Sequence, residues 1–261
     1  MASCLLVSQL TKGVTLARFN RPERLHALSE EMAGSIIELC RNVNADKSCV
    51  GVVFTGDTRA FSTGRDLKLS ASHSESDVRR YMDLACESVL AVAELEVPSC
   101  AAVDGHCLGW GFELALACDF RAVSKSTRMR LPETSLGLFP GAGGAVLLPR
   151  VVGQSIANDL IYTAREISGR EAYDLGLASR ISNEGETALD AATVVMKAIS
   201  QNAPLALRAG KKAMKAADSI SNVREALAAT RAFRDPLSAS ADHKEALLAF
   251  KERRKPVFKG E

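Results

Sequence analysis

Apolar and polar residues alternate along residues 5–10 and 14–19, and the dipeptide Lys12-Gly13 separates the two runs. Alternation with a period of two is typical of a strand with one buried face, and glycine favours a turn, so these runs predict a β-hairpin. Short apolar runs at 50–54, 98–103 and 120–124 predict further, buried strands.

Helical spacing begins after Ser29, a favoured N-cap that two glutamates follow in the first turn. Four apolar residues then recur at this spacing: Met32, Ile36, Leu39 and Val43. The pattern predicts a helix over 30–44, and similar patterns predict helices over 76–95 and 112–118. Strands that alternate with helices of this length indicate an α/β fold with largely parallel strands.

The pattern changes after about Ser182. From Thr187 onward four helical stretches follow without a strand between them, separated near Ala203-Pro204, Ser219 and Asp235-Pro236. We therefore expect an α/β core over residues 1–195 and a helical C-terminal module over residues 196–261.

Charge and composition limit the class of protein. The 261 residues are 47% apolar and 25% charged, with a net charge of +2, which is ordinary for a globular protein and gives no field that demands nucleic acid or an anionic membrane. No apolar run approaches the ~18 residues of a membrane span. The start lacks the parts of a signal peptide and has no clear transit peptide, so we expect either a cytoplasmic protein or a sequence that begins near a processed end.

The seven cysteines form no Cys-x-x-Cys pair, and the four histidines are scattered. We interpret the cysteines as buried thiols of a reducing compartment, and we expect no metal site.

Three glycine-containing segments, 60–68, 103–114 and 131–144, are the candidates for chemistry. The second runs from a strand through a glycine turn into a helix, and free N–H groups at a helix start favour an anion. Two such amides facing one oxygen would form an oxyanion hole. Glu113 and Glu133, on separate elements, could then act as base and acid.

Other interpretations of these segments stay open on the residues alone. The glycines could be plain turns, Glu113 could be a helix-start acid that favours the dipole, and Glu133 could be an ordinary loop residue. The segment Gly109-Trp110-Gly111 is not a complete dinucleotide-binding fingerprint, because Leu114 stands where the third glycine is required. Neither a P-loop nor a Gly-x-Ser-x-Gly elbow is present.

Over nearly its whole length the chain resembles the crotonase (enoyl-CoA hydratase/isomerase) family. Asn20-Arg21-Pro22 with Ala27-Leu28 is similar to the N-terminal motif of the family, and 61–68 is similar to its first oxyanion loop. Residues 109–113 and 132–144 resemble the second oxyanion turn and the second catalytic loop, with the family's spacing of twenty residues between the two glutamates. The tail, 247–254 and 258–261, is closest to the methylglutaconyl-CoA hydratase branch.

The resemblance implies a spiral ββα core with a C-terminal helical module that builds homotrimers or homohexamers. It implies an enoyl-CoA hydratase that adds water to a short or branched 2-enoyl-CoA thioester, without a metal or redox cofactor. Retention of both glutamates favours hydration, while an enoyl-CoA isomerase or another reaction of the family is the alternative. The family also suggests the mitochondrial matrix.

The resemblance assigns roles to residues in three groups. The N–H groups of Arg65 and Trp110 would hold the thioester oxygen. The catalytic water would lie between the two glutamates, with Glu133 as the proton donor to Cα, and the backbone of Gly141 would position it. Contacts to the CoA moiety are expected from the following residues: Leu25, Arg65, Asp66, Leu67, Lys68, Phe250 and Arg253.

Two residues depart from the family pattern. Arg65 stands where Ala or Gly is usual, and Trp110 replaces a glycine, although only the backbone N–H is required at either position. Trp110 must turn away or shrink the acyl pocket, and Arg65 would point to solvent or pair with an acidic acyl group.

Some members of the branch bind RNA with lysines on the first helix, and here that helix carries only Arg41. A basic stretch on the C-terminal module, Arg208 to Lys215, reads as a solvated helix face, so RNA binding is a minor hypothesis.

Overall fold

The computed structural model describes residues 3–66 and 74–261 of the chain. Its larger sheet has six strands in the order β1-β2-β3-β5-β7-β10. These strands are β1 (Leu5–Thr11), β2 (Val14–Phe19), β3 (Gly51–Thr55), β5 (Ser99–Val103), β7 (Phe120–Val123) and β10 (Arg180–Ile181).

The predicted hairpin and the predicted parallel strands are confirmed. β1 and β2 pair antiparallel across a turn at Gly13, whose φ of +70° favours glycine. Every other neighbouring pair of strands in this sheet is parallel. The central strands are buried on both faces, which explains why they read as short apolar runs without alternation.

A second, smaller sheet has four strands in the order β4-β6-β8-β9. They are β4 (Ala60–Ser62), β6 (His106–Leu108), β8 (Arg128–Arg130) and β9 (Ile167–Ser168). β3, β5 and β7 of the larger sheet each lead directly into β4, β6 and β8, and helices follow. This repeated β-β-α order is the spiral that the resemblance implied. Strands of two or three residues were not predicted, because they are too short to carry a periodic signal.

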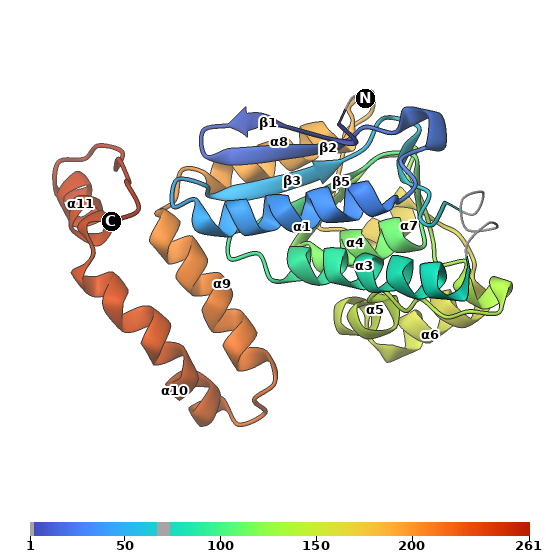
Figure 1. Ribbon diagram of the computed structural model, residues 1–261. Coiled ribbons are helices and arrows are strands. Elements are labelled where there is room, and N and C mark those ends of the chain that lie inside the picture. Colours follow the sequence, from blue (N-terminus) through green and yellow to red (C-terminus); the bar gives the residue numbers. More distant parts are fainter. Residues whose placement is uncertain (1–2, 67–73) are drawn as a thin grey trace.

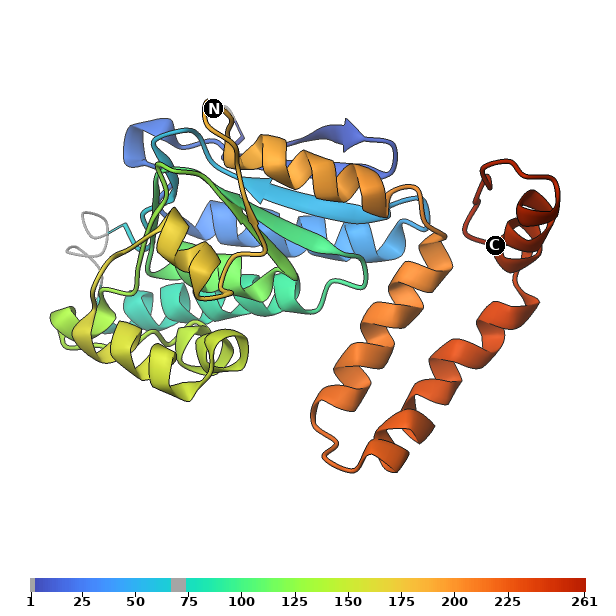
Figure 2. The same ribbon diagram turned by 180° about the vertical axis from the view of Figure 1, so that it is seen from behind.

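Helices cover both faces of the larger sheet. α1 (Glu30–Ala45), α3 (Glu75–Ala93) and α4 (Trp110–Ala117) lie on one face, and α8 (Ala188–Ile199) lies on the other (Figures 1 and 2). The Ser29 hydroxyl accepts a hydrogen bond from Met32 N, as expected of the N-cap. Three further helices complete the core: α5 (Gly144–Val152), α6 (Gln154–Thr163) and α7 (Gly169–Asp174).

The boundary expected at residue 195 falls inside α8. Ala188, Ala192 and Met196 of this helix are buried against the larger sheet. Gly51 of β3 leaves room for the contact, since a Cβ there would lie 2.3 Å from the Met196 methyl group. The core therefore extends to the end of α8.

The C-terminal module consists of α9 (Pro204–Asp218), α10 (Val223–Arg234), a short turn of helix at Asp235–Ala239 and α11 (Ala241–Lys251). α9 and α10 form an antiparallel pair that stands away from the core, and α11 lies beside the end of α10, opposite the loop that joins α9 to α10 (Figures 1 and 2). The four predicted C-terminal helices, α8 to α11, are thus confirmed.

The basic stretch on α9 is not a solvated face. Arg208 and Lys212 contact the Glu96 carboxylate at 3.4 and 2.8 Å, and Lys211 contacts Asp119 at 2.6 Å. Lys211 is 5% exposed. These ion pairs join the module to the core. The paired cations are therefore not a row of free charges that could bind RNA.

Candidate active site

Glu113 lies in the first turn of α4 and is 3% exposed. Its Oε1 accepts a hydrogen bond of 2.9 Å from the N–H of Gly144, the first residue of α5. Burial raises the pKa of Glu113 to about 7, because it disfavours the charged form more than the α5 amides favour it. At neutral pH both protonation states are therefore populated.

Glu133 follows Pro132 and starts a turn of 3₁₀ helix, Glu133–Leu136. Its carboxyl group lies over the glycine turn before α4, since a Cβ on Gly109 would be 2.7 Å from Oε1. Its Oε2 is buried and has no hydrogen-bond partner among the residues that the structure describes. Burial raises the pKa of Glu133, and Arg130 opposes the shift. An unsatisfied buried carboxyl oxygen beside a turn is consistent with a group that binds a substrate or water.

The two glutamates are brought together. The charge of Glu133 contributes to the raised pKa of Glu113, so the two carboxyl groups interact. They flank the same turn, which carries the Trp110 N–H at the first position of α4, where a helix offers no internal acceptor.

The first candidate amide follows β4. Gly64 has a φ of +78°, and its carbonyl accepts a 2.8 Å hydrogen bond from the Leu28 N–H. A Cβ on Gly64 would lie 2.6 Å from the Leu108 carbonyl oxygen and 3.2 Å from the Trp110 nitrogen. Glycine thus lets the loop after β4 approach the start of α4, and the Arg65 and Trp110 peptides become neighbours.

The Trp110 side chain turns into the core. It is 4% exposed, and its Nε1–H donates to the Ser88 hydroxyl at 3.1 Å. Its ring lies 6.2 Å from the ring of Phe19. The bulk of this residue is therefore accommodated between α3 and α4, and its backbone N–H stays at the turn.

Arg65 is half-buried and packs against α3 rather than simply pointing to solvent. Its guanidinium lies 5.4 Å from the centre of the Tyr81 ring, a distance that permits a cation–π contact. The neighbouring Asp66 is 5% exposed, and its carboxylate lies 3.5 Å from Arg21. A stacking aromatic residue on a distant helix could not be recognised from the loop sequence alone.

The other predicted substrate-binding residues are dispersed. Leu25 precedes the loop of 26–28 and has a φ of +48°, whereas Leu67 and Lys68 lie outside the described residues. Phe250 and Arg253 lie at the far end of the C-terminal module, so one chain does not bring them together with Glu113 and Glu133 (Figures 1 and 2).

Gly141 is exposed in the loop before α5, and its carbonyl accepts a contact of 3.6 Å from the Cys86 thiol. Sequence reasoning missed Cys86 and Gly144, the residues of α3 and α5 that border this loop. Gly144 belongs to the glycine-rich segment already singled out, whereas nothing local distinguished Cys86 from the other cysteines.

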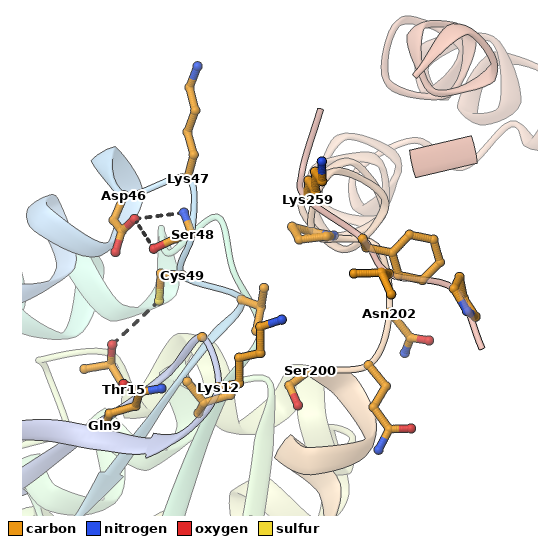
Figure 3. A pocket seen from close by; sticks show the side chains of 18 of the residues that line it. Gln9, Lys12, Thr15, Asp46, Lys47, Ser48, Cys49, Ser200, Asn202 and Lys259 are labelled. Carbon is orange, nitrogen blue, oxygen red and sulfur yellow. Dashed lines mark hydrogen bonds between the residues drawn. The ribbon is translucent and has the colours of Figure 1, made fainter. Parts of the chain in front are cut away.

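A large basic cleft lies elsewhere, between the β1–β2 hairpin, the turn after α1 and the C-terminal tail (Figure 3). Its volume is about 1140 Å³, and Lys12, Lys47, Lys255 and Lys259 contribute to its lining. It contains none of the candidate catalytic residues, so it is separate from the glutamate site.

All seven cysteines are free thiols, and only Cys86 is not buried. Within residues 3–66 and 74–261 no group of three or more His, Cys, Asp or Glu side chains could hold a metal ion. No helix in this part of the chain is long and apolar enough to cross a membrane.

Comparison with known proteins identifies the family. The sequence pattern of the enoyl-CoA hydratase/isomerase family matches residues 9–261, and the chain belongs to this family. It is 34% identical to the mitochondrial methylglutaconyl-CoA hydratase of Mus musculus, over 96% of this chain and 81% of that protein. It is 33% identical to an enoyl-CoA hydratase/isomerase of Bacillus subtilis, over the full length of both.

Solved structures agree with this membership. The crystal structure of an enoyl-CoA hydratase from Bacillus anthracis is similar with a TM-score of 0.95 and 33% identity, covering 99% of this chain and 100% of that one. An enoyl-CoA hydratase from Mycobacterium tuberculosis has a TM-score of 0.87 and 28% identity, with full coverage of both chains. The protein is thus an enzyme of the enoyl-CoA hydratase family with the crotonase fold.

Proposed function

We propose that the protein adds water across the double bond of a 2-enoyl-CoA thioester. The observation that carries the proposal is the pair of carboxyl groups at the turn that presents the Trp110 N–H, with Glu113 buried and Glu133 half-buried. Their raised pKa values lie closer to neutral pH than those of ordinary carboxyl groups, as general acid–base chemistry at that pH requires.

In the proposed reaction, one carboxylate accepts a proton from water while the water oxygen attacks Cβ. Negative charge develops on the thioester oxygen, where the N–H groups of Arg65 and Trp110 would stabilise it. Glu133 then donates a proton to Cα, and the thioester carbonyl is restored. The proton gained by the other carboxylate returns to Glu133 through solvent before the next turnover. The product contains the substrate and one water molecule, so the step needs no redox cofactor.

Replacement of Glu113 or Glu133 by Gln tests these roles. Each variant should lower kcat by at least ~10²-fold, because each removes a group that transfers a proton in the transition state. Glu184→Gln, at an exposed surface position, is the matched control and should keep wild-type activity. Full activity of both active-site variants would contradict the assignment.

Product analysis with 2-enoyl and 3-enoyl thioesters separates hydration from isomerisation.

The acyl group that we propose is short or branched, on the basis of similarity to the methylglutaconyl-CoA hydratases. A panel of acyl-CoA thioesters of increasing length and branching would measure kcat/KM for each. A higher value for long straight chains would contradict this choice.

We also propose that several copies assemble into a trimer or hexamer. The C-terminal module exposes large apolar side chains of a kind that usually marks an interface: Met214, Val223, Leu227, Leu247, Leu248 and Phe250. Contact of Phe250 and Arg253 with CoA would then have to come from a neighbouring copy.

We also propose a mitochondrial location, because the similar methylglutaconyl-CoA hydratase of Mus musculus is named mitochondrial. A bacterial relative is similar as well, so fractionation of cells is the test of this location.

A further inference from the structure

The loop of residues 21–28 contains a buried histidine in an unusual backbone conformation. His26 is 2% exposed, with a φ of +55°, and the preceding Leu25 has a φ of +48°. Two successive non-glycine residues in the left-handed region are held there by their surroundings, and such strain is often found at functional sites.

The His26 side chain connects two segments. Its Nδ1 accepts a 3.2 Å hydrogen bond from the Arg21 N–H, so the ring proton must be on Nε2. Nε2 lies 3.3 Å from the Asp57 carboxylate, an electrostatic contact in which Nε2 forms no hydrogen bond with the described residues. The other oxygen of Asp57 accepts from the N–H groups of Arg59 and Ala60, at 2.8 and 3.1 Å. The imidazole thus accepts a hydrogen bond at the start of the 21–28 loop and lies against the turn that leads into β4.

The backbone of the same loop holds Gly64 from both sides. The His26 carbonyl accepts from the Ser62 hydroxyl at 2.8 Å, and the Ser62 oxygen accepts from the Gly64 N–H at 3.1 Å. The Gly64 carbonyl accepts from the Leu28 N–H at 2.8 Å. In a trans peptide the C=O and N–H point in opposite directions, so this last bond fixes the direction of the Arg65 N–H.

We propose that His26 is a positioning residue, which as an uncharged imidazole aims the Arg65 N–H at the substrate carbonyl. The inference rests on the proposed role of that amide in the oxyanion hole. His26 itself touches no reacting atom in this scheme.

Protonation would break the arrangement. A second proton would have to go to Nδ1, where it would displace the Arg21 N–H. The charged groups that face the ring are Asp57, Arg59 and Glu23, and burial lowers the pKa of His26 while Asp57 opposes the shift. At neutral pH the imidazole is therefore uncharged, and the loop directs the Arg65 N–H. In acid the imidazole gains a proton, and this alignment is lost.

Three variants separate positioning from general packing. His26→Leu removes the acceptor of the Arg21 N–H and should lower kcat by about 10- to 100-fold, somewhat less than the loss of a whole oxyanion donor, with KM changed little. His26→Asn offers an oxygen where Nδ1 was and should restore most of the activity. His106→Leu, at an exposed histidine on β6, is the control and should behave as wild type.

The pH profile gives a readout that packing alone would not move. As the pH falls, kcat/KM of the wild type should first decrease because the Glu113 carboxylate gains a proton. It should then decrease more steeply as His26 gains a proton. His26→Asn should lose the second, steeper part. Asp57→Asn should shift it to lower pH, because the carboxylate stabilises the imidazolium. These two variants carry the test if His26→Leu fails to fold.

Cinnamoyl-CoA reports the alignment when it binds, because its absorption band moves to longer wavelength when its carbonyl is polarised, and the band is recorded before its double bond is hydrated. The shift should shrink in His26→Leu and return in His26→Asn. Unchanged kcat and band shift in His26→Leu would overturn the inference, and so would a loss that Asn does not restore. If wild type shifts the band but adds no water, the hydration proposal fails while the positioning test stands. If it does neither, the oxyanion hole itself is wrong.

Discussion

At the residue scale, Glu113 shows how burial brings the pKa of a carboxyl group close to neutral pH. The side chain is 3% exposed, and its pKa is raised from an ordinary 4.5 to about 7. The native state therefore holds its proton more tightly than the unfolded state does. Since the unfolded state binds fewer protons between these values, the free energy of unfolding falls as the pH rises from about 4.5 to 7.

Glu113→Gln should reverse this loss. Relative to wild type, the variant should gain about 1–3 kcal/mol in the free energy of unfolding between pH 4.5 and pH 8, because it has no buried charge to form. Urea denaturation at several pH values measures the difference. A constant difference across this range would show that Glu113 titrates normally.

Other residues of the site were less accessible to sequence reasoning. Both glutamates were found because the family spacing marks them. His26 gave no signal, since its role depends on Asp57 and Ser62, which lie more than thirty residues away. The direction of Trp110 depends on Ser88 in α3, and that of Arg65 on Tyr81 in the same helix.

At the scale of elements, periodicity was sufficient for the hairpin, the buried parallel strands and the long helices. It failed for β4, β6 and β8, whose three residues each are positioned by pairing with one another rather than by local preference. These short strands matter most for the site, because β4 and β6 end at the two candidate amides.

The contact between α9 and the core depends on buried cations. Lys211 donates to the Val97 carbonyl at 2.8 Å and to Asp119 at 2.6 Å. Lys211→Met would leave both acceptors without this partner and should lower the free energy of unfolding by about 1–3 kcal/mol. Chemical denaturation followed by circular dichroism measures it. Lys197→Met, at an exposed position on α8, should change stability by less than about 0.5 kcal/mol.

At the scale of the whole molecule, the core and the C-terminal module differ in how they bury apolar surface. The core encloses two apolar clusters, one on each face of the larger sheet. The module cannot enclose a core of its own, since α10 has no buried residue. Its apolar face is therefore the expected contact between copies.

A charge on that face should separate the copies. Leu227 is 64% exposed on α10, and Leu227→Lys should reduce the molar mass measured by light scattering to that of one chain or a smaller assembly. Ser221→Lys adds the same charge at an exposed polar position of the preceding turn and should leave the assembly intact. A wild-type protein that is monomeric at micromolar concentration would contradict the proposed oligomer.

The chain contains one tryptophan, and the backbone of that residue offers an amide to the proposed substrate oxygen while its indole lies inside the protein. Tryptophan emission, excited at wavelengths where the three tyrosines do not absorb, therefore has a single origin, adjacent to the proposed reacting group. A change in that tryptophan emission on adding a thioester reports on this turn without labelling.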